Sequence, residues 1–421
     1  MPSSAPWSSL SATECAAAIA QRIAAGHDVA WLDGGSEGRG VVGFDCDLAL
    51  ESDDADAIDA VDRLWQRSPD AVWIGCLSYD FAADLVLGRM PRRRALPGLI
   101  LRRYRSGLEL LPGGAVRQRG TPPPPEAASS PAAHDTAWPL VPLVPLWTAE
   151  HYRAQVAAAQ AFITAGDTYQ VNLAQRFFAP WQQPCRPSEL PGRAASVYLQ
   201  LRARAPAERG ALLPVPGGFV LSNSPETLVD VERDAAGVAV AHARPIKGTR
   251  PRASTDVADR AAREELRLSA KDRAEHVMIV DLVRSDLGRL ARTGSVHAPA
   301  QPTELALPTV HHLVTEIRAT LRDDVGLADL CAALVPGGSV TGAPKRRTIE
   351  IIEALEQHPR GIYCGAIILL EPTGLRMSIP IRTAMLTAGG LALHAGGGIV
   401  IDSDPEAERL ESIAKTRAFA G

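Results

Sequence analysis

The chain has 421 residues, of which 44 are basic and 48 acidic, and its formal net charge is −4. This near balance of charge argues against nucleic acid or an anionic membrane as a partner. The six cysteines are scattered without a C-x-x-C pair, and no apolar stretch reaches the ~18 residues of a transmembrane helix. We therefore expect a cytoplasmic protein with reduced cysteines and no zinc site.

The elements predicted before residue 120 are strands, and a break in composition follows them. Residues 71–78 and 99–111 read as strands, and turns are expected at Ser106-Gly107 and at residues 112–114. Residues 121–145 are rich in proline and alanine and have the period of neither a helix nor a strand. This segment indicates a linker or a long surface crossing.

After residue 145 the pattern gives runs of strands separated by long helices. Helices are predicted over residues 149–165, 259–290, 345–356 and 405–420. Strands are predicted over residues 169–178, 219–232, 238–247, 364–371 and 391–401. This order favours an α+β fold of antiparallel sheets flanked by helices over strict βαβ repeats. We expect an N-terminal subdomain of residues 1–120 and a catalytic region of residues 146–421.

A lysine in the segment RPIKGT, residues 244–249, is the first candidate for catalysis. Lys247 lies between a rigid Pro-Ile pair and a Gly-Thr turn. Burial would disfavour the charged form of its amine, and a neutral amine is a nucleophile. Glu226 follows Ser224-Pro225 upstream, so the two residues have the outline of a nucleophile and a nearby acid. A solvated surface lysine is the ordinary alternative.

Two pairs of acidic residues have the spacing of one helical face. Asp272 and Glu275 are three residues apart, as are Glu408 and Glu411, and Lys415 lies four residues further along the second face. Paired carboxylates suit Mg²⁺, which prefers oxygen ligands and shares its coordination sphere with an anionic substrate. Two solvated helix faces are the alternative, because the metal site requires the helices to converge.

Residues 336–345, PGGSVTGAPK, place glycines before a predicted helix, where free N–H groups can hold an anion. A nucleotide-binding P-loop has the four-residue gap of Gly337 and Gly342 but requires Lys-Ser/Thr where this chain has Ala343-Pro344. We therefore favour contacts of Ser339 and Thr341 with a carboxylate or hydroxyl group over nucleotide binding.

Three further features allow both a functional and a structural interpretation. The run Gly396-Gly397-Gly398 is either a close backbone approach or a cradle of N–H groups. Arg382 stands in an apolar strand context, where a guanidinium suits either a substrate carboxylate or a core ion pair. His312 is either a polarising group or a core histidine.

Ten stretches between about Leu146 and the C-terminus resemble, in order, the chorismate-utilising enzymes, which include anthranilate, aminodeoxychorismate, isochorismate and salicylate synthases. The stretches are GDTYQVNLAQRF, LSNSPETLV, RPIKGTRPR, KDRAEHVMIVDLVRSDLGR, HHLVTEIR, PGGSVTGAPK, GIYCGAI, IRTAML, AGGGIV and DPEAERLESIAK. The resemblance implies a large two-subdomain fold of antiparallel sheets flanked by helices.

The resemblance also implies a role for each candidate residue. Mg²⁺ would be held by Asp272, Glu275, Glu408 and Glu411. Chorismate would be bound by Gln170, Thr249, His312, Ser339, Tyr363, Arg382, Gly396, Gly398 and Lys415. Glu226 would be the general acid for the C4 hydroxyl group of chorismate, and Lys247 would be the nucleophile at C2.

Two positions distinguish members of the family. Aminodeoxychorismate synthases are similar to this chain in carrying lysine in PIKGT, whereas anthranilate and isochorismate formers typically carry alanine. Gln170 stands where isochorismate and salicylate synthases place a lysine base, and glutamine cannot activate water. The resemblance therefore implies amination of chorismate at C4 for 4-aminobenzoate and folate synthesis, with anthranilate synthase component I as the alternative.

Amination requires a source of ammonia. No cysteine of this chain stands in a G-x-C-x-G elbow, so no glutaminase is built into it. The family pattern implies a separate glutaminase subunit that supplies the ammonia.

Overall fold

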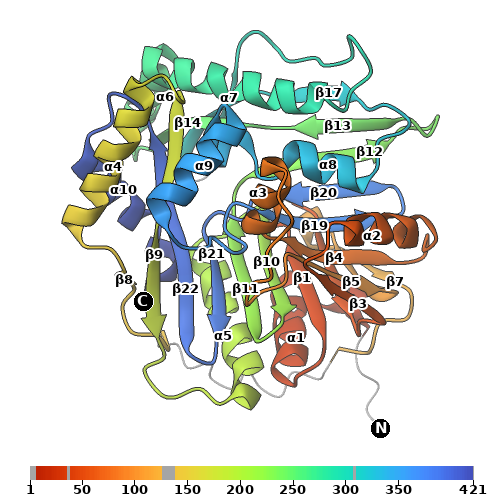
Figure 1. The fold of residues 1–421 in the computed structure, drawn as a ribbon. Helices are drawn as coiled ribbons and strands as arrows, with labels where there is room; N and C mark the ends of the chain where they lie inside the picture. The colour runs from red at the N-terminus through yellow and green to blue at the C-terminus, as the bar shows by residue number, and fades with distance from the viewer. Residues whose placement is uncertain (1–5, 36–37, 126–137, 307–309, 421) are drawn as a thin grey trace.

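The computed structural model describes residues 6–35, 38–125, 138–306 and 310–420 (Figure 1). Two large antiparallel sheets, a small third sheet and helices on the outer faces make up this part of the chain. The architecture confirms the α+β class expected from the order of the elements. No helix in the described ranges is both long and apolar enough to cross a membrane.

The largest sheet has eleven strands within the described residues. In spatial order they are β18 (Gly342–Ala343), β9 (Gln170–Pro180), β22 (Gly390–Ile399), β21 (Thr383–Thr387), β11 (Gly218–Ser224), β10 (Arg209–Val215), β1 (Val29–Asp33), β2 (Gly40–Phe44), β6 (Ser106–Leu110) and β7 (Val116–Arg119), with β8 (Val144–Pro145) paired to β9. The long antiparallel pair of β9 and β22 lies next to β18, and Asn172 pairs with Gly398 within it.

The second sheet has eight strands among the described residues. Their order is β17 (Ile317–Thr320), β13 (Ala239–Ala243), β12 (Thr227–Arg233), β20 (Gly374–Ser378), β19 (Ala366–Glu371), β4 (Val72–Leu77), β5 (Leu99–Tyr104) and β3 (Leu48–Ser52). The third sheet consists of β14 (Ile246–Pro251), β16 (Val310–Val314) and β15 (Thr303–Ala306).

Helices complete the layers. The α-helices are α1 (Ala12–Ala24), α2 (Asp56–Gln66), α3 (Tyr79–Leu87), α4 (Ala149–Thr164), α5 (Leu190–Arg204), α6 (Asp256–Leu268), α7 (Ala270–Gly288), α8 (Leu327–Leu334), α9 (Lys345–Glu356) and α10 (Pro405–Ala414). Short 3-10 turns are η1 (Trp7–Ser9), η2 (Pro112–Gly114), η3 (Pro187–Glu189), η4 (Gly338–Val340) and η5 (Arg417–Phe419).

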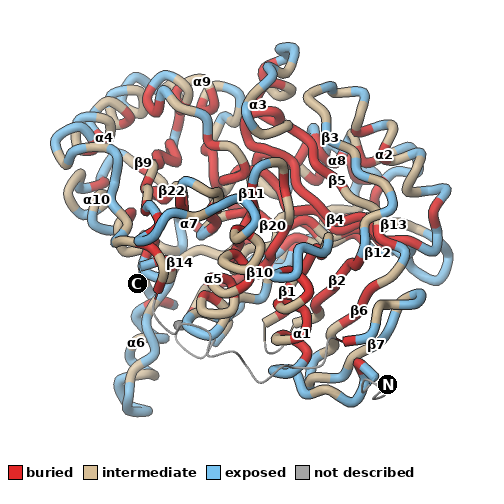
Figure 2. The backbone as a smooth tube through the Cα atoms, turned by 90° about the horizontal axis from the view of Figure 1, so that it is seen from below, coloured by how far each residue is buried: buried red, intermediate tan, exposed pale blue. Residues whose placement is uncertain are grey.

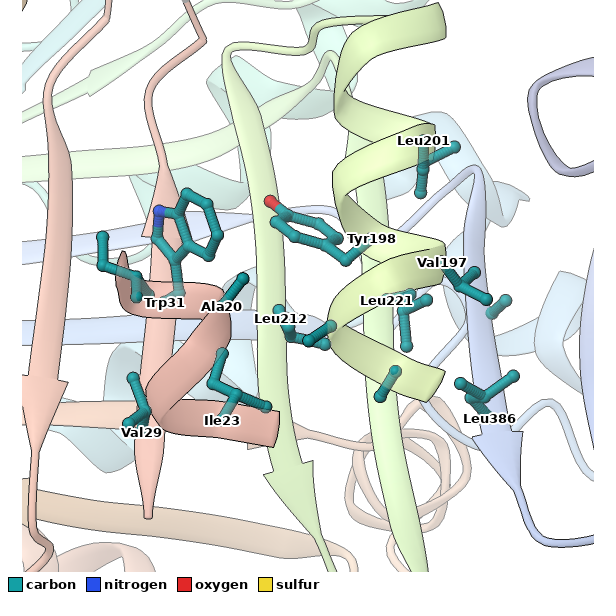
Figure 3. Packing of buried hydrophobic residues seen from close by; sticks show 14 of the residues in the cluster. Ala20, Ile23, Val29, Trp31, Val197, Tyr198, Leu201, Leu212, Leu221 and Leu386 are labelled. Atoms are coloured by element: carbon teal, nitrogen blue, oxygen red, sulfur yellow. The ribbon is translucent and has the colours of Figure 1, made fainter. Parts of the chain in front are cut away.

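The two large sheets pack face to face, and helices cover their outer faces. Apolar side chains of β1, β2, β10 and β11 meet those of β4, β5 and β19 in one buried cluster between the sheets. On the other face of the large sheet, α1 and α5 bury Ile23, Tyr198 and Leu201 against the strands (Figure 3). Trp31 of β1 meets Tyr198 edge to face with ring centroids 5.2 Å apart. Figure 2 shows that burial follows the strands, while α6 is largely exposed.

The structure divides three of the elements predicted from the sequence. The segment 219–232 is two strands in different sheets, because Pro225 cannot donate a backbone hydrogen bond to a sheet. Pro245 separates β13 from β14 in the same way. The helix predicted over 259–290 is α6 and α7, since the Ser269 side chain accepts a hydrogen bond from the Asp272 N–H group and starts a new helix.

Two other predictions were wrong in detail. Ser106-Gly107 does not form a turn but begins β6, and β5 and β6 belong to different sheets. The last helix ends at Ala414 rather than at residue 420, and a 3-10 turn follows it.

Strands from both sides of the proline-rich segment share the two large sheets. β1 pairs with β10, and β4 pairs with β19. Residues 126–137 of the predicted linker lie outside the described residues, whereas Trp138 and Leu140 beyond them are buried. The division into residues 1–120 and 146–421 stays a prediction about folding units, since the sheets themselves are shared.

Candidate active site

Glu226 lies where the chain passes from β11 in one large sheet to β12 in the other. Its backbone is fixed there, because its N–H group donates to Ser224 Oγ at 3.1 Å and its carbonyl accepts from the Ile379 N–H group at 3.1 Å. Ser339 Oγ of η4 donates to Glu226 Oε1 at 2.9 Å. The carboxyl group is therefore held by backbone and side-chain contacts from both sheets.

The charge environment of Glu226 brings several predicted site residues together. Burial raises the pKa of the Glu226 carboxyl, while the Ser339 hydrogen bond and the cations Lys247, Lys415 and Arg382 oppose the rise without cancelling it. Three cations thus act on one partly buried carboxyl that retains its proton to a higher pH than usual. Such a group suits a proton donor next to anionic groups of a ligand.

Lys247 lies on β14 of the small third sheet. Gly248 beside it has φ +75°, and the pairing of β14 with β16 is irregular at this point, which is the kind of backbone that glycine permits. Lys247 Nζ lies 3.8 Å from Glu275 Oε2 of α7, and the lysine side chain is 24% exposed. The amine is thus partly accessible and not fully buried.

Thr249 and His312 form a pair within the same small sheet. Thr249 Oγ1 lies 2.9 Å from His312 Nδ1, which also lies 3.2 Å from the Gly248 carbonyl oxygen. Because that carbonyl only accepts, Nδ1 carries the hydrogen and Nε2 is left as the acceptor. Burial lowers the pKa of His312, partly offset by the Gly248 carbonyl, so its imidazole is neutral over a wider pH range.

The four predicted metal ligands are found as two pairs, each engaged by other side chains. On α7, Asp272 Oδ2 accepts from Arg250 Nη2 at 2.9 Å, and Glu275 faces Lys247. On α10, Glu408 Oε1 accepts from Ser403 Oγ at 2.7 Å, and Glu411 lies 2.8 Å from Lys415 Nζ. Within the described residues, no three His, Cys, Asp or Glu side chains are close enough to share a metal ion. The predicted four-carboxylate cluster is therefore not assembled in this structure.

The run Gly396-Gly397-Gly398 lies on β22, with Glu408 near one face of the strand and Gln170 near the other. Lys415 Nζ donates to the Gly396 carbonyl at 2.8 Å. A methyl group on Gly397 would lie 2.8 Å from Glu408 Oε2, so one face of the strand presses against α10. A methyl group on Gly398 would lie 2.8 Å from Gln170 Cδ on the other face.

The Gln170 amide is a polar group without a partner in the described structure. The residue is 1% exposed, and neither Nε2 nor Oε1 has a hydrogen-bond partner there. Buried amides are nearly always hydrogen-bonded, so this one points to a polar ligand or an ordered water. The position agrees with the predicted role of Gln170 in substrate binding, although that role stays a prediction.

Arg382 and Tyr363 have contrasting surroundings. Arg382 is exposed just before β21 and has φ +48°, an uncommon conformation for a non-glycine residue. Its exposure argues against a core ion pair, and its charge acts on both Glu226 and His312. Tyr363 is buried, stacks on His394 at 5.5 Å, and lies under Arg360 at 5.6 Å. Its contact with substrate stays a prediction.

The segment 336–345 does not form a nucleotide-binding loop. Gly342 and Ala343 pair with β9 as strand β18, so their backbone groups are used within the sheet. Lys345 Nζ donates to Asp286 Oδ2 at 2.8 Å and to the Ala333 carbonyl at 3.0 Å. The lysine is thus held inside the protein and is not free for a phosphate.

Sequence reasoning missed the buried pair of Arg360 and Glu356. Arg360 Nη2 donates to the Asn172 carbonyl at 2.6 Å and Nη1 to the Val340 carbonyl at 3.1 Å. Glu356 Oε1 accepts from the Ala174 N–H group at 2.8 Å. The pair therefore satisfies backbone groups of β9 that no neighbouring strand bonds, and through the Val340 carbonyl it also connects β9 to η4. Its i, i+4 spacing was visible in the sequence, but the same spacing is typical of solvated helix pairs.

Comparisons with known proteins place the chain in a family. Residues 20–421 match the family described as chorismate binding enzyme. Aminodeoxychorismate synthase component 1 of Salmonella typhimurium (strain LT2) is 43% identical over 265 residues, 63% of this chain and 55% of the relative. Its counterpart in Escherichia coli (strain K12) is 42% identical over 269 residues, 64% of this chain and 56% of the relative. The matched stretch therefore spans about half the length of these curated relatives.

Solved structures agree in fold. Anthranilate synthase component I from Streptococcus pneumoniae TIGR4 superposes with a TM-score of 0.75 at 24% identity, covering 92% of this chain and 93% of that one. The menaquinone-specific isochorismate synthase from Escherichia coli gives 0.73 at 19% identity, covering 96% and 90%. These likenesses show the fold, and the sequence match shows the lineage: the chain belongs to the chorismate-binding enzyme family.

Proposed function

We propose that this protein aminates chorismate at C4 to form 4-amino-4-deoxychorismate. The observation that carries the proposal is the electrostatic interaction of Lys247 with Glu226, in which the lysine charge opposes, without cancelling, the rise that burial gives the pKa of the carboxyl. A partly exposed amine and a carboxyl that retains its proton are the nucleophile and the acid that such an exchange needs. The relatives named aminodeoxychorismate synthase component 1 support the same activity.

The proposed reaction has two substitution steps, followed by a proton transfer that restores Glu226. The neutral Lys247 amine forms a bond to C2 while the C4–O bond breaks, and Glu226 gives its proton to the departing hydroxyl group, which leaves as water. Ammonia then bonds to C4 while the C2–N bond to Lys247 breaks and the lysine leaves as a neutral amine. The ammonium group at C4 returns one proton to Glu226. Each cycle thus consumes chorismate and ammonia and releases one water.

The surrounding residues bind and orient the substrate in this proposal. Arg382, Lys415 and the backbone of Gly396 and Gly398 hold the carboxylates, since both cations already lie near Glu226. Thr249, His312, Ser339, Gln170 and Tyr363 line the remainder of the site.

Mg²⁺ is proposed on the chemistry of the donors, because both pairs offer only carboxylate oxygens. The interaction of both Lys247 and Lys415 with Glu226 supports a shared site for Glu275 and Glu411, the salt-bridge partners of these lysines. A bound Mg²⁺ would neutralise a substrate carboxylate there. No step above is derived through the metal, since the described residues do not assemble its ligands into one cluster.

Ammonia is proposed to come from a separate glutaminase subunit, in the cytoplasm and for 4-aminobenzoate and folate synthesis. The designation component 1 of the relatives implies a partner component for those proteins. The chain itself has no nucleophile elbow for a glutaminase.

Product analysis tests the activity. Purified protein is incubated with chorismate, Mg²⁺ and a high concentration of ammonium salt, and the products are identified by mass spectrometry and fluorescence. A product that an added lyase converts to 4-aminobenzoate supports the proposal. Absence of this product, both with ammonium salt and with a glutaminase partner, would reject it.

Anthranilate synthase component I is the second candidate, because relatives of that name are also found. The one from Haloarcula marismortui is 39% identical over 273 residues, 65% of this chain and 53% of the relative. Fluorescent anthranilate as the main product would favour this alternative, and Lys247 argues against it.

A further inference from the structure

A small cavity adjoins Glu226 and is not used in the scheme above. Its volume is about 20 Å³, and its polar lining residues are Glu226, Ser339, Thr227 and Asp286. Apolar residues, among them Val283 of α7, form much of the remaining wall. One water needs ~10–15 Å³ and two to four polar partners, so this cavity suits a single water molecule.

Asp286 in the wall of the cavity belongs to a second, buried ion pair. Lys345 Nζ lies 2.8 Å from Asp286 Oδ2, and the two side chains are 12% and 15% exposed. Burial raises the pKa of Asp286 and lowers that of Lys345, and the attraction between the two partners opposes both shifts. A buried pair of this kind is sensitive to anything that adds or removes a charge or a hydrogen bond nearby.

The charged groups around the two carboxyls are distinct. Lys247, Lys415 and Arg382 act on Glu226, and the Cys364 thiol also lies near it. Lys345 and Arg289 act on Asp286. The cavity is thus lined by two carboxyl residues, each of which interacts with its own set of cations.

We propose that one water molecule in this cavity bridges the carboxyl groups of Glu226 and Asp286, and that the Asp286–Lys345 pair positions the proton of Glu226 through it. The water accepts a hydrogen bond from protonated Glu226 and donates one to the Asp286 carboxylate. Asp286 touches no substrate and is a positioning residue. The kinetic part of this inference rests on the proposed function, whereas the water bridge does not.

Infrared spectroscopy without substrate tests the bridge. The carbonyl band of protonated Glu226 is identified by its loss in Glu226→Gln. Val283→Ile adds one methyl group, comparable in size to a water, to the cavity wall and keeps all charges. It should displace the water and move the Glu226 band to higher wavenumber, as expected when a hydrogen bond is lost. Val280→Ile, three residues earlier on α7 and not in the wall, should leave the band in place. An unchanged band in Val283→Ile would overturn the bridge.

A double-variant titration tests the coupling to Asp286. Asp286→Asn removes a negative charge and leaves Lys345 unpaired, so the pKa of Glu226 should fall by about 0.5–1 unit. In the double variant with Val283→Ile, this decrease in the pKa of Glu226 should be less than half as large. In the double variant with Val280→Ile, the full decrease should remain. A fall of equal size in both backgrounds, or none, would overturn coupling through the cavity. If Asp286→Asn does not fold, the Val283→Ile band decides the bridge.

Kinetics separates this inference from the proposed function. Asp286→Asn should lower kcat about tenfold with an unchanged KM for chorismate. Failure of the wild-type protein to make 4-amino-4-deoxychorismate would reject the proposed function and leave the infrared result standing. Activity together with unchanged infrared bands would reject the bridge alone.

Discussion

Arg360 Nη2 lies 2.6 Å from Glu356 Oε1, and both side chains are 1% exposed. Each partner also bonds to the backbone of β9, so the pair occupies the stretch of this edge between β18 and β8. Because Arg360 also binds the Val340 carbonyl, the same pair fixes η4, which carries Ser339.

Loss of one partner should therefore destabilise the fold. Glu356→Ala leaves a buried guanidinium and a backbone N–H group unpaired, and we expect a loss of about 3–5 kcal/mol in the free energy of unfolding. Urea denaturation measures it. Glu353→Ala on the same helix breaks the more exposed pair with Arg89 and should cost about 1 kcal/mol or less. Equal losses would show that Glu356 has no special part in the sheet edge.

Glu226 should impose an alkaline limit on the activity. Its pKa is raised in the folded protein, so the protonated donor is present below that pKa and is lost as the pH rises through it. Glu226→Gln should lower kcat about 10²–10⁴-fold and remove this limb of the pH–rate profile. The exposed Glu232→Gln on β12 should change neither. A limb that survives in Glu226→Gln belongs to another group.

Lys247 should be required for amination. Lys247→Ala removes the nucleophile and should abolish formation of 4-amino-4-deoxychorismate, measured by mass spectrometry. Lys247→Arg keeps the charge beside Glu275 but not a neutral amine, and it should be equally inactive. Full activity in either variant would exclude the lysine-linked route.

The three adjacent glycines should respond differently to alanine. A methyl group on Gly396 would lie 1.9 Å from the Leu173 carbonyl oxygen, so Gly396→Ala should disrupt the sheet and lower the Tm. The methyl groups of Gly397→Ala and Gly398→Ala would contact the side-chain ends of Glu408 and Gln170, respectively, and these ends can move. These two should keep a near-normal Tm and raise the KM for chorismate. Gly192→Ala, with only Ala24 at 3.9 Å, is the neutral control.

Removal of divalent metal tests the proposed ion. We expect EDTA to abolish product formation and Mg²⁺ to restore it. Glu411→Gln should raise the Mg²⁺ concentration needed for half-maximal rate. Undiminished activity after exhaustive chelation would exclude the metal.

The sequence predicted the elements better than their connections. The helix over 345–356 is found with the same bounds, since Pro344 precedes it and its apolar period is strong. Whether 219–232 forms one strand or two depends on which sheet each half joins, which local patterning does not reveal. The sequence suggested Lys247 and Glu226 as a pair, but the approach of Lys415 and Arg382 to Glu226 was not visible, because these residues come from separate parts of the chain. Only the resemblance to a family connected those two cations with the pair.

The sharing of both large sheets by early and late strands has a consequence for synthesis on the ribosome. β4, residues 72–77, pairs with β19, residues 366–371, and β9, which begins at residue 170, pairs with β22, which ends at residue 399. Neither sheet can be completed until residues 366–399 have left the ribosome. Until then the early strands have free edges that can pair with other chains. Nascent-chain folding should therefore be late, slow and dependent on protection of those edges.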